Sequence, residues 1–377
     1  MKKMSKKKEF LNFIYFKLKR YLNEKSEYKK VNDPRRVKLI NSITLTEEQK
    51  KKIDTFYKTN YGKTIPYNWH RLYQSYTKNF DEKYFPEFLY IPYFERLMNP
   101  KEFAEVFQDK SMVGLLTSDT DIIYPKIYIS AVNGITRDEN SNIISLEKAV
   151  ENINSLGDKK LFIKPCVDSC SGEGCKILNL ENGIDISSKQ NLKDILIEYN
   201  GNFLVQECIE NHESLKKLHP ESINTFRVMT YVWNGKINCC PIILRIGQGK
   251  SNVDNAHAGG MFIGVKNDGQ LCNTAFTEFQ TRYAKHPDSG IIFSDYKIPY
   301  MQKIIDSAIK LHSKVPQLGI ISWDLTLGKN EEVILIESNL AGGGIWVIQM
   351  SHGCGIFGEN TASILQYLSK ERIAKEF

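Results

Sequence analysis

The stretch GIISWDLTLGKNEEVILIESNLAGGG, at Gly319–Gly344, has the pattern of two strands joined by a short polar turn. Side chains two residues apart on a strand lie on one face, so Glu337 and Asn339 point in the same direction. If the two strands pair, Asp324 of the first strand can lie beside them. Two carboxylates and a carboxamide would then converge, and these oxygen ligands suit Mg²⁺. Three polar residues that merely close a hairpin are the alternative, which this stretch alone leaves open.

The composition is that of a soluble globular protein, with 41% hydrophobic and 25% charged residues. A length of 377 residues predicts two or three domains. No apolar run approaches the roughly 18 residues that span a bilayer, and no signal peptide is visible, so we expect a cytoplasmic protein. The eight Cys indicate free thiols, because the spacing of Cys166, Cys170 and Cys175 matches no standard zinc or iron–sulfur motif.

Positive charge is concentrated in residues 1–36, a basic N-terminal arm. This arm carries thirteen Lys and Arg against four Asp and Glu, a net charge of +9, which leaves −2 for the rest. We therefore expect no nucleic-acid partner, since a broad basic face is not indicated. Residues 9–23 have an amphipathic helical pattern that ends before Asp33-Pro34. We favour a helix that packs on the body or is solvated, and peripheral membrane contact through residues 1–36 is the alternative.

Residues 37–108 are expected to form a mainly helical, aromatic-rich N-terminal domain. One helix begins at Thr44–Glu48, where a cap residue precedes acidic residues, and ends near Tyr61, before Gly62. Eleven aromatic residues follow within residues 66–96, and we interpret them as the core of this domain. An exposed aromatic surface that binds a sugar is the alternative.

The middle of the chain changes to strands and polar turns. A short apolar strand, residues 161–165, ends at Lys164, and a later strand, residues 203–210, carries Gln206 and Glu207. The loop after Lys164 is rich in small residues, whose backbone N–H groups can wrap an anion. This loop contains Ser169, Ser171, Gly172 and Gly174. It lacks the GK[ST] of a P-loop, and a Gly-rich turn without function is the alternative.

Asn234-Gly235 lies between two apolar runs, which is the strongest short signal for a β-hairpin. Arg227 and Arg245 lie inside its strands, where a buried Arg normally needs an anionic partner. In a strict two-residue-turn register the two arginines would point to opposite faces. Cys240-Pro241 offers a place for a β-bulge, because Pro cannot donate to the ladder. We predict this bulge, and with it both arginines on one face.

Two further polar, Gly-rich segments lie in the C-terminal half. Asn255 and His257 belong to a loop before the strand MFIGV, and they can line an acceptor site; a structural role for His257 is equally open. Gly342 and Gly343 follow soon after Asn339. Their flexible backbone is where we expect the acyl substrate.

The order of these motifs resembles the ATP-grasp superfamily of carboxylate–amine ligases. The stretches NTFRVMTYVWNG, DNAHAGG and WDLTLGKNEEVILIESN are similar to the branch associated with sugar transfer and polysaccharide biosynthesis. The resemblance covers about Lys110 to Tyr367. It implies an α+β fold in which two α+β subdomains of residues 109–377 sandwich ATP, with subdomain boundaries near residues 160 and 210.

The resemblance also implies how ATP is held. Lys110, which follows Asp109, and Lys164 resemble the two lysines that bind the α- and β-phosphates. Glu207, together with Gln206, resembles the hinge that contacts adenine and ribose. The loop 169–174 resembles the one that closes over the phosphates.

The remaining motif residues resemble the catalytic end of such a site. Asp324, Glu337 and Asn339 match the ligands of Mg²⁺, of which two ions are expected. Arg227 and Arg245 match residues that face the γ-phosphate and the acyl group. Independently of the resemblance, attack of a carboxylate on ATP brings anions together, and these cations would neutralise the charge.

The expected activity is therefore ATP- and Mg²⁺-dependent ligation of a carboxylate to an amine through an acylphosphate. The resemblance implies cell-surface polysaccharide biosynthesis, such as that of a capsule. The partners would be small-molecule or nucleotide-sugar substrates, with a uronic acid or an amino acid as the carboxylate. A phosphotransferase that acts on a sugar or alcohol hydroxyl is the first alternative, because it would use the same residues. A non-catalytic nucleotide-binding or membrane-docking module is the second.

Overall fold

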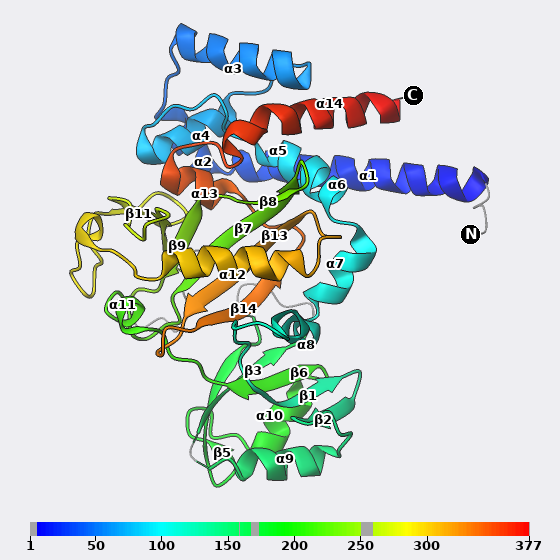
Figure 1. Ribbon diagram of the computed structural model, residues 1–377, viewed down its shortest axis with the longest axis vertical. Coiled ribbons are helices and arrows are strands. Elements are labelled where there is room, and N and C mark those ends of the chain that lie inside the picture. Colours follow the sequence, from blue (N-terminus) through cyan, green and yellow to red (C-terminus); the bar gives the residue numbers. More distant parts are fainter. Residues whose placement is uncertain (1–5, 158, 167–172, 250–258, 377) are drawn as a thin grey trace.

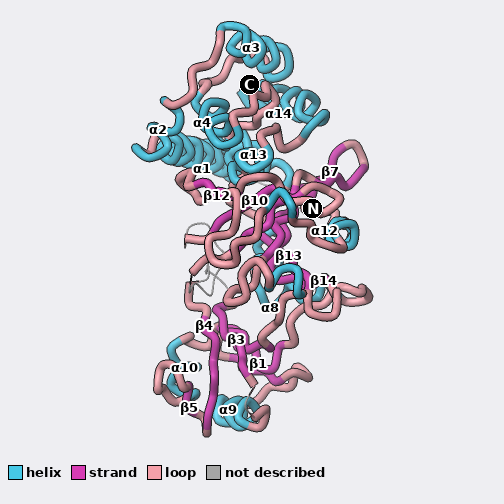
Figure 2. The backbone as a smooth tube through the Cα atoms, turned by 90° about the vertical axis from the view of Figure 1, so that its left-hand side faces the viewer, coloured by secondary structure: helices cyan, strands magenta, loops and turns pink. Residues whose placement is uncertain are grey.

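The chain forms three parts along its long axis: a helical layer, a large sheet and a small sheet (Figure 1). This computed structural model describes residues 6–157, 159–166, 173–249 and 259–376. Figure 2 shows the same order of parts from the side, with the large sheet between the helical layer and the small sheet. The expected α+β class is confirmed.

The helical layer gathers helices from both ends of the chain. It contains α1 (Lys6–Val31), α2 (Pro34–Asn41), α3 (Glu47–Tyr61), α4 (Asn68–Thr77), α5 (Glu87–Leu89), the π-helix η1 (Tyr90–Glu95), α6 (Arg96–Met98), α13 (Trp346–His352), the short 3₁₀ helix η5 (Gly358–Asn360) and α14 (Thr361–Glu376). Helix α13 packs on α4, and α14 packs on α3. Residues 37–108 therefore share their core with C-terminal helices, which the sequence interpretation did not anticipate.

Local signals set the ends of these helices. Thr46 and Gln49 form a capping box at the start of α3, and Gly62, with a φ of +80°, ends it as expected. Helix α1 is longer than the predicted 9–23 and continues to Val31. Asp33 then caps α2, with Pro34 at its first position. Within the described residues, no helix combines the length and apolar character that a bilayer span requires.

Most of the aromatic residues in 66–96 lie in the interior, so their interpretation as a core is confirmed. Those buried are Trp69, Tyr73, Tyr76, Tyr84, Phe85, Phe88, Tyr90 and Phe94. The C-terminal half of α1 joins this core, because the Tyr28 ring lies 5.1 Å from that of Trp69. The preceding half extends past the body in Figure 1, and Ile14, Leu18 and Leu22 are exposed there.

The small sheet has six strands in the order β2-β1-β6-β3-β4-β5. They are β1 (Ile127–Val132), β2 (Ile135–Asp138), β3 (Lys160–Pro165), β4 (Lys176–Glu181), β5 (Ile184–Asp185) and β6 (Phe203–Glu207). Helices α9 (Leu146–Asn154) and α10 (Leu192–Glu198) bury the apolar side of this sheet. The expected boundary near residue 160 falls inside the sheet, because β1 pairs with β6. The boundary near residue 210 follows the end of β6.

The large sheet has eight strands in the order β12-β11-β10-β9-β7-β13-β14, with β8 paired to β7. They are β7 (Thr225–Trp233), β8 (Lys236–Cys239), β9 (Ile242–Ile246), β10 (Met261–Val265), β11 (Ala275–Phe276), β12 (Arg282–Tyr283), β13 (Ile320–Leu327) and β14 (Val333–Asn339). The predicted hairpins at Asn234-Gly235 and around the 319–344 stretch both form. The remaining helical segments are α7 (Lys101–Gln108), α8 (Lys110–Val113), η2 (Gly114–Thr117), α11 (Glu213–Lys216), η4 (Phe293–Asp295) and α12 (Met301–Ser313).

The two faces of the large sheet have different covers. Phe226 and Val228 of β7 belong to a core with α12, whereas Met229 and Tyr231 belong to the core of the helical layer. Because strand side chains alternate, Arg227 shares the face of Met229. The helical layer covers only part of this face. Arg227 lies toward the small sheet, so the candidate residues occupy the junction between the two sheets.

Candidate active site

Asp324 is fully buried on β13, where two arginines neutralise its carboxylate. Arg227 lies directly opposite on β7 and binds it through two parallel hydrogen bonds, Nε to Oδ1 at 2.9 Å and Nη2 to Oδ2 at 2.8 Å. Arg245 reaches the same Oδ2 with Nη2 at 3.1 Å. Such charge-assisted, bidentate geometry is strong and fixes the planes of both groups. Both arginines therefore lie on one face of the sheet.

The predicted bulge at Cys240-Pro241 is what brings the arginines together. Thr230 pairs with Cys239 in β8, but Arg227 pairs with Ile243 of β9, one residue beyond an unbulged register. The extra residue turns Arg245 to the face of Arg227. The bulge and the shared face are confirmed.

A second bulge, in β14, places Glu337. Asp324 is opposite Glu337, but Leu325 is opposite Leu335, so Ile336 is the extra residue. Asn339 then donates from Nδ2 to Asp324 Oδ2 at 3.2 Å and to Glu337 Oε1 at 3.3 Å. The three oxygen-bearing side chains predicted to converge do so.

The two carboxylates affect each other's ionisation. Burial and the neighbouring Asp324 both raise the pKa of Glu337, against the charges of Lys110 and Arg227. Burial also opposes ionisation of Asp324, but Arg227 and Arg245 outweigh it and hold the pKa of Asp324 well below its usual range. Burial and the neighbouring Asp324 thus make the ionised form of Glu337 less favourable than that of Asp324.

These residues fit a divalent cation. A metal ion would relieve the repulsion between Asp324 and Glu337, and a turn of the Asn339 amide would present its oxygen. No group of three His, Cys, Asp or Glu side chains in the described chain is placed to hold a metal. Mg²⁺ would therefore depend on this mixed set together with the phosphates of a nucleotide.

The two candidate lysines come to Glu337 from the small-sheet side. Lys164, at the end of β3, is only 5% exposed. Burial lowers its pKa, and the charge of Glu337 acts in the opposite direction. Lys110 begins α8 after its cap, Asp109, and its charge lowers the pKa of Glu337. Lys164 of the small sheet and Lys110 of α8 therefore both act electrostatically on a carboxylate of the large sheet.

Tyr124, which the sequence analysis did not single out, connects both lysines. Its hydroxyl donates to the Lys110 carbonyl at 2.9 Å, and its ring centroid lies 5.5 Å from Lys164 Nζ. Tyr124 therefore positions the segment that carries Lys110 against the strand that carries Lys164.

Gln206 and Glu207 lie at the end of β6, at the connection between the sheets. Gln206 is buried, and its Nε2 donates to the Pro125 carbonyl at 3.3 Å. Glu207 Oε1 accepts from the Lys126 N–H at 2.8 Å. Both side chains thus hold the segment before β1. Their contact with a nucleotide stays a prediction.

The candidate loop residues divide between described and undescribed parts of the chain. Ser169, Ser171, Gly172, Asn255 and His257 lie outside the described residues. Gly174 is described, and its carbonyl accepts from the Tyr199 hydroxyl at 2.6 Å. It lines a cavity of about 590 Å³ on the small sheet, together with Lys176 and Glu198.

Glu95 is a site residue that sequence reasoning missed. It ends the π-helix η1 and accepts hydrogen bonds from the N–H groups of Gly342, at 2.8 Å, and Gly343, at 3.3 Å. Burial raises its pKa to about 7, although these two bonds act against the shift. π-Helical turns are rare and frequent at functional sites. In the sequence, the available signal for Glu95 was its position as an acidic residue within the aromatic-rich stretch 66–96.

These features bring cations and carboxylates together at the junction of the two sheets. The sequence model of the sugar-transfer associated ATP-grasp family matches residues 92–364. The chain belongs to this ATP-grasp family, which confirms the resemblance. No curated protein matches the sequence.

Solved structures with similar folds include three ligases or carboxylases. The VanG D-Ala:D-Ser ligase from Enterococcus faecalis is 12% identical, with a TM-score of 0.40 over 70% of this chain and 61% of that one. D-alanyl-alanine synthetase A from Vibrio cholerae is 13% identical, with a TM-score of 0.42 over 73% and 67%. Biotin carboxylase from Campylobacter jejuni is 13% identical, with a TM-score of 0.41 over 70% and 46%. The chain thus spans about 61% of the first of these proteins.

Proposed function

We propose that the protein is an ATP- and Mg²⁺-dependent ligase that joins a carboxylate to an amine through an acylphosphate. The observation that carries this proposal is the convergence of Asp324, Glu337 and Asn339 at the junction of the two sheets, where the charges of Lys110 and Lys164 act on Glu337. Asp324, Glu337 and Asn339 would hold Mg²⁺, which would neutralise phosphate charge when bound.

The chain's own residues would supply the remaining charge compensation. Lys164 and Lys110 would bind phosphate oxygens of ATP, and Arg227 and Arg245 would face the transferred phosphoryl group. The carboxylate oxygen bonds to the γ-phosphorus as the β–γ bridge breaks and ADP leaves. The amine nitrogen then bonds to the acyl carbon, phosphate leaves, and the nitrogen loses a proton. Exclusion of water would protect the acylphosphate.

The substrate class is inferred from the family. Its association with sugar transfer supports a sugar substrate, either a uronic acid or a sugar that receives an amino acid, in cell-surface polysaccharide biosynthesis. The acyl group would lie next to Gly342 and Gly343, directly beyond the metal ligands.

The test is product analysis with purified protein, ATP, Mg²⁺ and panels of uronic and amino acids with amines. ADP and phosphate should appear together, and hydroxylamine in place of the amine should trap a hydroxamate. Glu337→Gln should reduce turnover at least about 100-fold. Glu359→Gln is the control, because that side chain is 94% exposed and pairs with Lys83. Release of AMP instead of ADP would exclude the acylphosphate route.

A phosphotransferase is the second candidate, because the same cations would serve a hydroxyl acceptor. A phosphorylated product without free phosphate would favour it. ATP binding that is independent of Mg²⁺ and unchanged in Glu337→Gln would instead favour a non-catalytic nucleotide-binding module.

A further inference from the structure

A separate cavity of about 160 Å³ lies between the helical layer and the segment Gly342–Gly344. Its lining includes Glu27, Lys30, Arg36, Trp69, Glu87 and Trp346. The residues come from α1, α2, α4, α5, η1 and the start of α13. None of them belongs to the nucleotide and metal set.

Part of the wall is aromatic or apolar, beside four charged residues. Trp69 and Trp346 supply aromatic rings, and Leu72 and Ile91 supply aliphatic surface. An apolar cavity of about 150 Å³ admits a benzene ring, so this one can hold a single six-membered ring. Trp faces also attract ligand cations.

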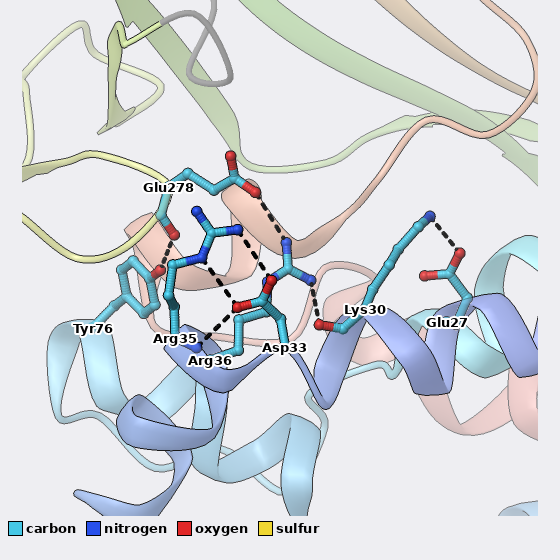
Figure 3. A network of polar contacts seen from close by, with 7 residues as sticks. All are labelled: Glu27, Lys30, Asp33, Arg35, Arg36, Tyr76 and Glu278. Carbon is cyan, nitrogen blue, oxygen red and sulfur yellow. Dashed lines mark hydrogen bonds and ion pairs between the residues drawn. The ribbon is translucent and has the colours of Figure 1, made fainter.

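The cations of the wall are already paired (Figure 3). Lys30 Nζ lies 2.7 Å from Glu27 Oε1. Arg36 Nη2 lies 3.3 Å from Glu278 Oε1. The Arg36 guanidinium also stands 5.1 Å from the Trp346 ring centroid. A ligand carboxylate would have to compete with these existing partners. The wall therefore does not favour an acid.

One carboxylate of the cavity wall, Glu87, has an oxygen that accepts no hydrogen bond from the described residues. Glu87 is 5% exposed, and its Oε2 accepts from the Tyr73 hydroxyl. Its Oε1 is buried and has no hydrogen-bond partner among the described residues. A buried acceptor without a donor costs free energy, so the missing donor is expected from a ligand. Carboxylate, tryptophan rings and a small volume together suit an ammonium group.

The cavity borders the proposed reaction site across the Gly342–Gly344 segment. A Cβ on Gly343 would lie 3.8 Å from Ser322 Oγ and 4.0 Å from Glu95 Oε1, and a Cβ on Gly344 would lie 3.9 Å from Glu87 Oε1. Ser322 is in turn the cross-strand partner of Asn339. Adding a cross-strand spacing of about 5 Å puts the segment on the order of 10 Å from the metal ligands.

We propose that this cavity binds the amine substrate of the ligase, a ring-sized compound whose ammonium group donates to Glu87 Oε1 and passes one proton to that carboxylate, so that the free amine nitrogen can bond to the acyl carbon. The inference rests on the proposed ligase function and adds the location and the charge of one substrate. The acyl group would lie on the metal side of Gly342–Gly344, and the amine would reach it from the side of α1 and α2 past these residues, which carry no side chain. Glu87 and Trp346 are then the residues that select an amine.

The test is binding measured by calorimetry, with glucosamine as the probe and glucose as its neutral analogue. Glucosamine should bind with a Kd of about 1 mM and glucose at least about tenfold more weakly. Glu87→Gln should weaken glucosamine binding at least tenfold, whereas exposed Glu48→Gln should not change it. Ile91→Trp, which fills a half-buried wall position, should abolish binding without altering Glu87.

Mg²⁺ and ATP binding is measured on the same samples. No glucosamine binding by the wild type at about 10 mM, equal binding of glucose, or unchanged binding in both variants would overturn the proposal. If glucosamine binds as expected but no acid yields ADP, the ligase function fails while the amine site stands. If ADP forms with hydroxylamine but glucosamine does not bind, the cavity assignment alone fails.

Discussion

Asp324 and Glu337 face each other across β13 and β14, yet burial and charge push their pKa values in opposite directions. Two arginines stabilise the ionised carboxylate of Asp324. Burial and the adjacent charge of Asp324 instead disfavour ionisation of Glu337. Sites built for a charged ligand commonly keep such unfavourable pairs. Replacing each carboxylate by its neutral amide should therefore change the free energy of unfolding in opposite directions.

Glu337→Gln is expected to stabilise the ligand-free protein by about 1 kcal/mol at pH 8, because it removes like-charge repulsion in a partly buried pair. Asp324→Asn is expected to destabilise it by about 3 kcal/mol, since Arg227 and Arg245 then lose their anion. Urea unfolding of both variants in the absence of Mg²⁺ measures the two effects. Equal destabilisation by both changes would contradict the arrangement, and Glu359→Gln provides the unaffected reference.

Glu87 makes protein stability depend on pH. Burial raises its pKa from 4.5 to about 7, partly opposed by the Tyr73 hydrogen bond. The folded protein therefore holds a proton that the unfolded chain releases between these two values, and stability falls as pH rises through that window. Glu87→Gln keeps an acceptor for Tyr73 but carries no charge. It should match the wild type near pH 4.5 and gain up to about 3 kcal/mol by pH 8.

Urea unfolding at several pH values from about 4.5 to 8 checks this prediction. Exposed Glu48→Gln should follow the wild-type curve throughout. A constant difference between Glu87→Gln and the wild type across the window would show that Glu87 does not titrate there.

Much of the fold was predictable because its signals are local. Asn234-Gly235 specifies a tight turn, and Pro241 marks the bulge that aligns Arg227 with Arg245. Strand alternation placed Glu337 and Asn339 on one face, and the expected pairing of the two strands placed Asp324 beside them. Their convergence also depends on the bulge at Ile336, which carries neither Gly nor Pro and gave no signal.

Other features depend on contacts between distant segments. The pairing of β1 with β6 joins residues far apart in the chain, so a boundary near residue 160 was a natural but misplaced division of the small sheet. The packing of α13 and α14 on N-terminal helices has the same origin. Glu87 and Glu95 could not be singled out, because their importance comes from burial and from backbone groups of Gly342 and Gly343.

The basic arm offers a membrane test. Ile14, Leu18 and Leu22 recur every four residues on α1 and are exposed, next to Lys17, Lys19 and Arg20. If membrane contact, the alternative to a packed or solvated arm, is the role of this face, it should bind anionic vesicles with about 1 kcal/mol of binding free energy per basic residue near the surface. Cosedimentation with phosphatidylserine vesicles should fall at high salt and in Leu18→Asp. Leu115→Asp, an exposed apolar position outside the arm, is the control, and binding unchanged in Leu18→Asp would exclude the arm.

Alanine substitutions at Gly342 and Gly343 separate the effect of backbone strain on stability from the effect of a narrower substrate site on activity. Gly342 has a φ of +73° and open space where a Cβ would be, so Gly342→Ala should cost about 1–2 kcal/mol of stability. Gly343 has no left-handed φ, and its Cβ would meet Ser322 and Glu95 at ordinary contact distances. Gly343→Ala should therefore change stability by less than about 0.5 kcal/mol.

Because the Gly343→Ala substitution narrows the proposed acyl position, it should lower kcat/KM for the carboxylate about tenfold, or about 1.4 kcal/mol. Steady-state ADP release and urea unfolding measured on both variants decide the matter, and full activity of Gly343→Ala would place the acyl group elsewhere.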